Sequence, residues 1–338
     1  MTLKQKTGGV EKPVKAGSPW KKFYQNLEVM KMQKCEVVPS DGKIDAVKLE
    51  RYRKICRESD IDDFFSLLVF LPGEAPIFKK LLEDPDSLVR RRGAAALASA
   101  AGKKTNISAL VPDLTKALID PEEHVRLNAT WALKEAALIR IPIYTALEAL
   151  TNGLFDPFYK VRSETTHALG AAAIEGIDIS AALPALALAL SDTSDFVASG
   201  AAQALRHSAK NGIDITIAVP ALVKAMSYTN ADVRSNAALA LESAAEKGTQ
   251  ISAAFPALAN ALSDEDWSVR SSSTDALVKA AENLDHDARM SMTKTVMRFM
   301  ESPAFKLEVE QNTMLFEEMI GNMHRIIGKV QEVEEKAA

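Results

Sequence analysis

Residues that could act as acids, bases, nucleophiles or metal ligands are few in this sequence, and their spacing fits no catalytic motif. None of the histidines stands in a His-Glu pair or at the HxxxH spacing of a helical metal site. The cysteines Cys35 and Cys56 are too few for a disulfide framework and lack a metal-binding spacing. No glycine-rich phosphate loop and no GxSxG motif occurs. The sequence therefore predicts no catalytic residue, no cofactor and no metal site. The histidines are His124, His167, His207, His286 and His324.

Composition narrows the class of protein further. The chain has 338 residues, of which 47% are hydrophobic and only 6% aromatic, so small and aliphatic side chains dominate. The net charge of −4 argues against nucleic-acid binding, which needs cations to neutralise phosphates. No apolar run reaches the length of a membrane span, and the lysine-rich N-terminus lacks the apolar segment of a secretory signal. We expect a cytoplasmic protein with no membrane contact.

A valine recurs every 36 residues through most of the chain, and each copy follows a short polar turn. The valines are Val89, Val125, Val161, Val197, Val233 and Val269. A spacing that stays constant over six copies indicates a repeat array, in which each unit buries its apolar face against its neighbours. The sequence therefore predicts six repeat units over residues 69–284.

Each unit has the pattern of two helices joined by a turn, which predicts an all-α fold. The first helix, helix A, has a proline near its start in five units, where the missing N–H costs least. The second, helix B, has apolar residues at the spacing of one helix face. Its leucine column is complete: Leu97, Leu133, Leu169, Leu205, Leu241 and Leu277. Four residues before helix B are strong N-cap types: Asp86, Ser194, Asn230 and Asp266.

The repeated pattern I-S-A-A-L-P-A-L in helix A, followed by D-x-x-x-x-V-R-x-x-A-A-x-A-L in helix B, resembles short HEAT-like repeats, which also occur in phycobilin lyases. The resemblance implies a right-handed α-solenoid with helix B on its concave face. It also implies a hydrogen-bonded ladder between the turn aspartates and the arginines after the valines. Ala198 and Tyr228 depart from the ladder pattern. The residues that fit it are Asp84, Arg90, Asp120, Arg126, Asp156, Arg162, Arg234, Asp264 and Arg270.

The N-terminal end lacks the repeat. Residues 1–40 form a basic tail and docking segment, and residues 41–68 form a helical cap for the open end of the array. Two helices are expected here, at roughly 43–58 and 60–71. The aromatic residues after position 20 dock either on the array or on a partner, and the sequence does not separate the two. They are Trp20, Phe23 and Tyr24.

The C-terminal end, residues 285–338, also lacks the repeat and is expected to form a helical cap. A methionine-rich helix at roughly 285–300 precedes a long amphipathic helix at roughly 304–335. The apolar residues of the long helix recur mostly at heptad spacing, which suits either a cap over the last unit or self-association with a second helix. They are Val309, Phe316, Ile320, Met323, Ile327 and Val330.

Function in a repeat array is expected where the copies differ. On helix B, the positions opposite the buried stripe vary, and we interpret them as a protein-binding surface. Trp131 stands out, because clustered exposed apolar groups mark interaction sites and tryptophan is a frequent binding anchor. The aromatic residues Phe155, Phe158 and Tyr159 fall on the turn edge, as edge packing or as a second contact site. The predicted surface comprises Leu127, Trp131, Glu135, Leu138, His167, Gln203, Arg206 and His207.

These features favour a non-catalytic scaffold, adaptor or accessory subunit that binds one or more proteins through the helix-B surface and the two ends. The alternative is a cofactor-attachment or enzyme-maturation factor of the bilin-lyase type. In that case the groove holds a tetrapyrrole or a peptide near Trp131 and His167. Nucleic-acid binding is disfavoured because the groove has few cations.

Overall fold

The computed structural model describes residues 44–58, 72–302 and 313–337. Residues 46–338 form one compact unit, and every described element in it is a helix or a 3₁₀ turn. The all-α prediction is therefore confirmed. Three predictions lie outside the described residues: the tail and docking segment at 1–40, the cap helix at 60–71, and Val309 of the long helix.

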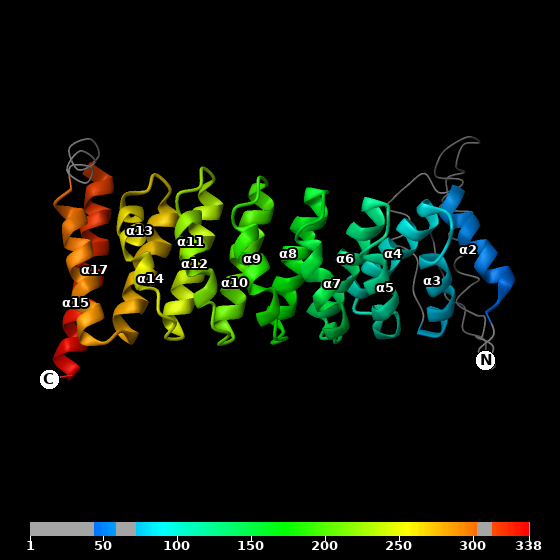
Figure 1. The fold of residues 1–338 in the computed structure, drawn as a ribbon, viewed down its shortest axis with the longest axis horizontal. Coiled ribbons are helices and arrows are strands. Elements are labelled where there is room, and N and C mark those ends of the chain that lie inside the picture. The colour runs from blue at the N-terminus through cyan, green and yellow to red at the C-terminus, as the bar shows by residue number, and fades with distance from the viewer. Residues whose placement is uncertain (1–43, 59–71, 303–312, 338) are drawn as a thin grey trace, which may run out of the picture. The chain divides into compact units, whose positions relative to one another are not determined.

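Helices A and B alternate along the chain, and successive pairs stand side by side (Figure 1). The A helices are short: α3 (Ala75–Leu82), α5 (Val111–Ala117), α7 (Leu147–Gly153), α9 (Leu183–Ala189), α11 (Val219–Ala225) and α13 (Phe255–Asn260). The B helices are α4 (Ser87–Gly102), α6 (Glu123–Leu138), α8 (Tyr159–Ile174), α10 (Asp195–Lys210), α12 (Ala231–Glu246) and α14 (Trp267–Asn283). Each B helix packs against the next one, so the B helices form a continuous layer.

Short 3₁₀ turns lead into the A helices, and further helices cover both ends. The turns are η2 (Pro72–Glu74), η3 (Ser108–Leu110), η4 (Tyr144–Ala146), η5 (Ser180–Ala182), η6 (Thr216–Ala218) and η7 (Ser252–Ala254), while η8 (Ala261–Ser263) follows α13. At the N-terminal end, α2 (Ala46–Glu58) packs against α4. At the C-terminal end, α15 (His286–Met300) packs against α13, and α17 (Thr313–Ala337) packs against α14.

The core consists of the predicted leucine column and the small residues beside it. All six leucines of the column are completely buried, as are five of the six repeated valines; Val161 is 2% exposed. Small residues allow neighbouring B helices to approach closely. The closest approach is at Gly200 on α10, where an added Cβ would lie 2.1 Å from Oγ1 of the buried Thr166 on α8.

This contact predicts that Gly200→Ala lowers the free energy of unfolding by about 1–3 kcal/mol, because the methyl group overpacks the interface. The same change favours the helix intrinsically by about 1 kcal/mol. In a Thr166→Ala background the Oγ1 contact is removed and only the Cβ of residue 166, at 3.0 Å, stays close, so Gly200→Ala should then cost less. Urea unfolding of the wild type, the single variants and the double variant measures this difference. A stabilising effect in both backgrounds would contradict the packing seen here.

The ends of helix B agree with most of the expected capping. The side chains of Asp86, Asn230 and Asp266 accept a backbone N–H of the first turn, as expected. Ser194 makes no such bond, so that expectation was wrong, whereas Glu122 caps α6 by accepting from the N–H of Val125. The longer Glu side chain reaches the N–H one residue further along. At the other end, Gly176 takes a left-handed conformation with φ of +76°, as do its equivalents in later units.

Arginine–aspartate pairs join neighbouring units along the A–B turn edge. Each arginine donates Nε and Nη2 to both oxygens of the next unit's aspartate, and Nη1 to turn carbonyls of its own unit. For Arg126 the two bonds to Asp156 are 2.5 and 2.9 Å, and Nη1 lies 2.9 Å from the carbonyl oxygen of Asp120. The other pairs are Arg90–Asp120, Arg162–Asp192 and Arg234–Asp264.

These bonds lower the pKa of two of the ladder carboxylates. Burial raises the pKa of Asp120, but the hydrogen bonds from Arg90 and from the N–H of Glu122 outweigh it and hold the pKa below its ordinary value. The same balance lowers the pKa of Asp192. Asp120 and Asp192 are therefore ionised at neutral pH.

The ladder is interrupted once, between the fourth and fifth units, where Ala198 and Tyr228 replace the arginine and the aspartate. The carbonyl of Asp192 would otherwise accept from that arginine; instead the hydroxyl of Tyr228 donates to it. Asn230 also donates to Asp195 at 2.9 Å. The interruption thus keeps the turn carbonyl satisfied but lacks a bidentate ion pair.

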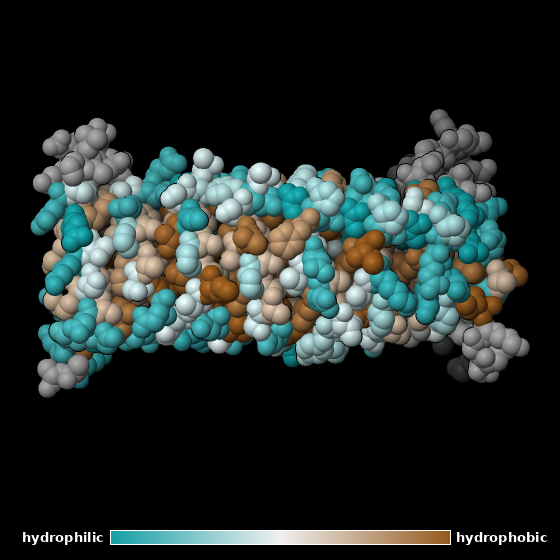
Figure 2. All heavy atoms as spheres, in the orientation of Figure 1, coloured by the Kyte–Doolittle hydropathy of each residue, from teal (hydrophilic) through white to brown (hydrophobic). Residues whose placement is uncertain are grey.

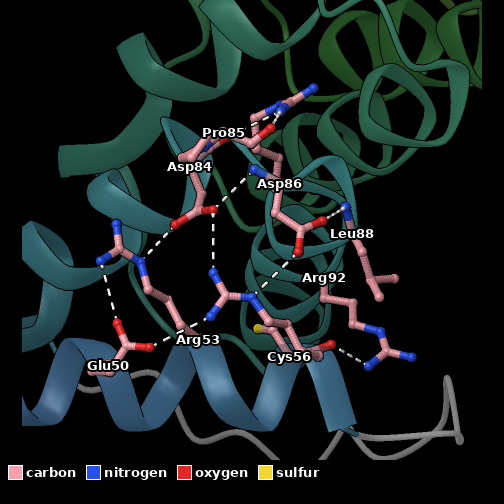
Figure 3. Close-up of polar contacts among 10 residues, drawn as sticks. Glu50, Arg53, Cys56, Asp84, Pro85, Asp86, Leu88 and Arg92 are labelled. Atoms are coloured by element: carbon pink, nitrogen blue, oxygen red, sulfur yellow. Dashed lines mark hydrogen bonds and ion pairs between the residues drawn. The ribbon is translucent and has the colours of Figure 1, made fainter.

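The two end caps extend the ladder beyond the repeats. At the N-terminal end, Arg53 of α2 donates to Asp84 at 2.6 Å, as Figure 3 shows, which also places Arg92 beside the carbonyl of Cys56. At the C-terminal end, Arg270 donates to both carboxylate oxygens of Glu318 on α17, at 3.1 and 2.6 Å. The N-terminal cap therefore supplies a guanidinium to the first unit, and the C-terminal cap supplies a carboxylate to the last unit. A further repeat would supply the same groups.

Candidate functional site

The helix-B surface, defined here as Leu127, Trp131, Glu135, Leu138, His167, Gln203, Arg206 and His207, spans the adjacent helices α6, α8 and α10. All eight residues are exposed or half-buried, so the structure brings the predicted residues together on one layer. Not every position of the predicted columns is open: Ala98, Ala171 and Ser243 are buried between neighbouring helices.

The α6 end of this surface is apolar and aromatic. Trp131 is 38% exposed and Leu138 is 42% exposed. The indole Nε1 of Trp131 donates to a carboxylate oxygen of Glu135 at 3.0 Å, one helical turn away. Lys134 pairs with Glu164 on α8 at 2.6 Å, which ties the two helices together beside the indole. The ring is thus held in one orientation while part of its surface stays open.

Two histidines follow on α8 and α10. Desolvation by neighbouring protein atoms lowers the pKa of His167, and the charge of Lys134 adds to this effect while Glu164 opposes it. Desolvation also lowers the pKa of His207, with Arg206 and Lys210 adding to it. Both rings are therefore mainly neutral at physiological pH, and they offer hydrogen-bond donors and acceptors rather than charge.

Arg206 differs from the ladder arginines. Its Nε is buried, and no group in the described part of the chain accepts its hydrogen. On the next helix, burial raises the pKa of Glu242, Asp275 raises it further, and the cations Arg206 and Lys210 act in the opposite direction. The surface therefore changes from cationic on α10 to anionic on α12 and α14.

The described residues show neither an arrangement typical of a metal site nor a helix typical of a membrane span. No group of three or more His, Cys, Asp or Glu side chains in 44–58, 72–302 and 313–337 is arranged to hold a metal ion. No helix within those ranges combines the length and the apolar character that crossing a bilayer requires. In Figure 2, the apolar residues of the face in view lie mainly along the middle and the hydrophilic ones along the two long edges.

Two models of known sequence families match parts of this chain. Residues 111–206 match the family described as HEAT repeats, and residues 254–284 match the HEAT repeat. The chain contains HEAT repeats. Search of curated proteins gave no matching sequence.

Engineered proteins and designed armadillo repeat proteins are among the solved structures that superpose on this chain. One engineered protein superposes with a TM-score of 0.61 at 23% identity, covering 86% of this chain and 76% of its own. A designed armadillo repeat protein has a TM-score of 0.52 at 24% identity, covering 61% of this chain and 100% of its own. Another, solved in complex with the peptide (KR)4, has a TM-score of 0.52 at 19% identity, covering 64% of this chain and 99% of its own. These likenesses support the α-solenoid fold alone.

Beyond the HEAT repeats, α17 buries a stripe that only partly coincides with the predicted pairing residues. Met323 and Val330 are buried, together with Met319 and Ile326, against the last repeat, whereas Ile320 and Ile327 are half-buried. The side chain of Phe316 lies outside what the structure describes. Arg325 of α17 pairs with Asp275 of α14 at 2.7 Å. The helix therefore covers the last HEAT repeat, and pairing through Ile320 and Ile327 stays a prediction.

The aromatic residues of the third HEAT repeat divide between packing and exposure. The ring of Phe158 lies 5.7 Å from that of His124 and 5.9 Å from that of Tyr159, measured between centroids. Phe155 and Tyr159 are 61% and 42% exposed. Sequence reasoning missed the ladder contacts of Arg53 and Glu318, because neither residue belongs to a repeat and no periodicity points to it.

Proposed function

We propose that this chain is a non-catalytic adaptor or accessory subunit that binds a segment of a partner protein along the helix-B surface. The observation that carries the proposal is Trp131, an aromatic ring fixed by Glu135 yet partly open to solvent. An ordered, partly exposed tryptophan loses little entropy on binding and gains much from burial. Repeat solenoids commonly serve protein binding, which supports the same reading.

The chemistry of the surface defines the segment it would accept. Trp131 and Leu138 suit an apolar side chain. Arg206, a half-buried cation on α10, suits a carboxylate, because a guanidinium pairs strongly with a carboxylate. We therefore propose a partner segment with an apolar anchor followed by an acidic residue. We further propose that binding takes place in the cytoplasm, where a buried thiol such as Cys56 remains reduced.

The test is the loss of binding in Trp131→Ala. We expect the affinity for a partner, first captured by cross-linking in native extract and then purified, to fall about tenfold or more, as for other interface anchors. Isothermal titration measures the change. Trp267→Ala is the matched control, because Trp267 is 69% exposed but stands at the first position of α14, away from this surface. Equal losses in the two variants, or unchanged binding in Trp131→Ala, would refute the proposed surface.

A further inference from the structure

The loop at the end of α6, residues 138–144, differs from the later loops that join one repeat to the next. At the left-handed position, later units have Gly176, Gly212 and Gly248, with φ of +76°, +79° and +79°. Here Arg140 takes φ of +64°, as Lys104 does in the preceding loop with φ of +63°. This conformation disfavours any residue with a Cβ, whereas glycine adopts it freely. The loop thus presents a cationic side chain at the expense of backbone strain.

The next positions of this loop also lack the side-chain cap that the later loops have. In later units the side chains of Asp178 and Asp214 accept the N–H of Ser180 and Thr216, which starts the 3₁₀ turn. Pro142 replaces the acidic residue and has no side-chain acceptor. Tyr144 replaces the small hydroxyl residue and is 64% exposed. Neither replacement strengthens the loop, so both point to a role outside folding.

Two open hollows lie on either side of Arg140. One has a volume of about 580 Å³ and is lined by Lys104, Leu138, Ile139, Ile141 and Pro142 among others. The second has a volume of about 400 Å³ and is lined by Pro142, Tyr144 and Ile174 among others. Arg140 borders both. The walls of the first hollow are mainly apolar, whereas those of the second are mainly polar and include the carboxylate of Glu175. The cations Lys104 and Arg140 line the first hollow.

Arg140 has donors left for a partner besides the ion pair it makes within the chain. Its Nε donates to Glu175 at 2.8 Å, and the arginine side chain is 85% exposed while that of Glu175 is 18% exposed. A guanidinium has five N–H donors, so Arg140 can bind a partner's carboxylate and keep its bond to Glu175.

We infer that the loop 138–144 is a second docking surface, for an acidic segment of a partner protein. The segment places a carboxylate on Arg140 and one bulky apolar side chain in the first hollow. Two cations, Lys104 and Arg140, against one carboxylate, Glu175, favour an acidic segment. This surface shares Leu138 with the helix-B surface but lies apart from Trp131, which is seven residues before Leu138 in α6, about 10 Å along the helix.

The test uses a display library of random linear peptides, selected on the full chain and then synthesised. The reverting variant Arg140→Gly/Pro142→Asp/Tyr144→Ser gives the loop the residue types of positions 176, 178 and 180. We expect this variant to fold with an unchanged or higher Tm, and yet to lose about tenfold or more in affinity for a selected acidic–apolar peptide. Trp131→Ala should leave that peptide's affinity unchanged. Arg140→Glu should bind a peptide with lysine in place of the acidic residue.

The outcomes separate this inference from the proposed function. Selected peptides that depend on Trp131 and not on the loop would overturn the inference and leave the proposed function standing. Peptides that depend on the loop but show no acidic preference would overturn the carboxylate assignment to Arg140. Selection of no peptide at all would count against both surfaces. The second surface is established if the peptides depend on the loop alone and if Arg140→Glu binds the peptide with lysine in place of the acidic residue.

Discussion

Replacing Leu169 by alanine is expected to lower the free energy of unfolding by about 2–5 kcal/mol, the range for a buried leucine whose removal leaves a cavity. Leu169 is completely buried in α8, in the middle of the array. Because repeats are stabilised mainly by contacts with their neighbours, a cavity here weakens two interfaces at once. Urea unfolding followed by circular dichroism measures the change, read from the midpoint and the slope.

Leu188→Ala is the control for this cavity. Leu188 lies in α9 and is 66% exposed, so its truncation removes a similar volume without opening a void. Its effect should stay within about 0.5 kcal/mol, as for most surface substitutions. Similar losses in both variants would mean that the leucine column does not form the core.

Arg126→Ala is expected to lower the free energy of unfolding by about 2–4 kcal/mol, because it leaves a shielded carboxylate without its cation. The side chains of Arg126 and Asp156 are only 12% and 7% exposed. The substitution also removes the donor to the carbonyls of Asp120 and Pro121. Binding of a partner at Trp131 should persist once the variant is folded, since the ladder lies on the turn edge.

The matched control is Arg325→Ala, which removes an arginine–aspartate pair whose side chains are 54% and 37% exposed. Exposed pairs contribute about 0–1 kcal/mol, so the two variants should differ clearly in thermal unfolding. If Arg126→Ala abolished partner binding while its melting temperature held, the ladder would be part of the binding site and the structural reading would be wrong.

The periodic parts of this structure follow from the sequence because a constant spacing fixes which face of each helix is buried. The leucine column is an example: once Leu97 is assigned to the core, the period places Leu133 and the later copies there too. The ladder was instead implied by the resemblance to HEAT-like repeats, and in the structure an arginine in one unit meets an aspartate 30 positions later. Because the pattern repeats, an assignment made for one unit applies to all six.

Residues that break the period were harder to predict, because their contacts depend on distances that no pattern encodes. The absence of an arginine at Ala198 is plain in the sequence, but the hydroxyl of Tyr228 reaching the carbonyl of Asp192 is not. The left-handed conformation of Arg140 was likewise missed, since the residue type usual at that position, glycine, is absent. On the helix-B surface, the position of each side chain could be predicted, but not the orientation that Glu135 imposes on Trp131.

The interruption of the ladder at Tyr228 has a mechanical consequence. At the other repeat-to-repeat junctions in the described part of the chain, bending toward or away from that edge must stretch a bidentate ion pair. At the junction of α10 and α12 it must stretch only the bonds of Tyr228 and Asn230. We therefore expect bending to be largest at the junction of α10 and α12, between the segment with Trp131 and the segment with Glu242. A partner that contacts both segments would then fix the angle between them.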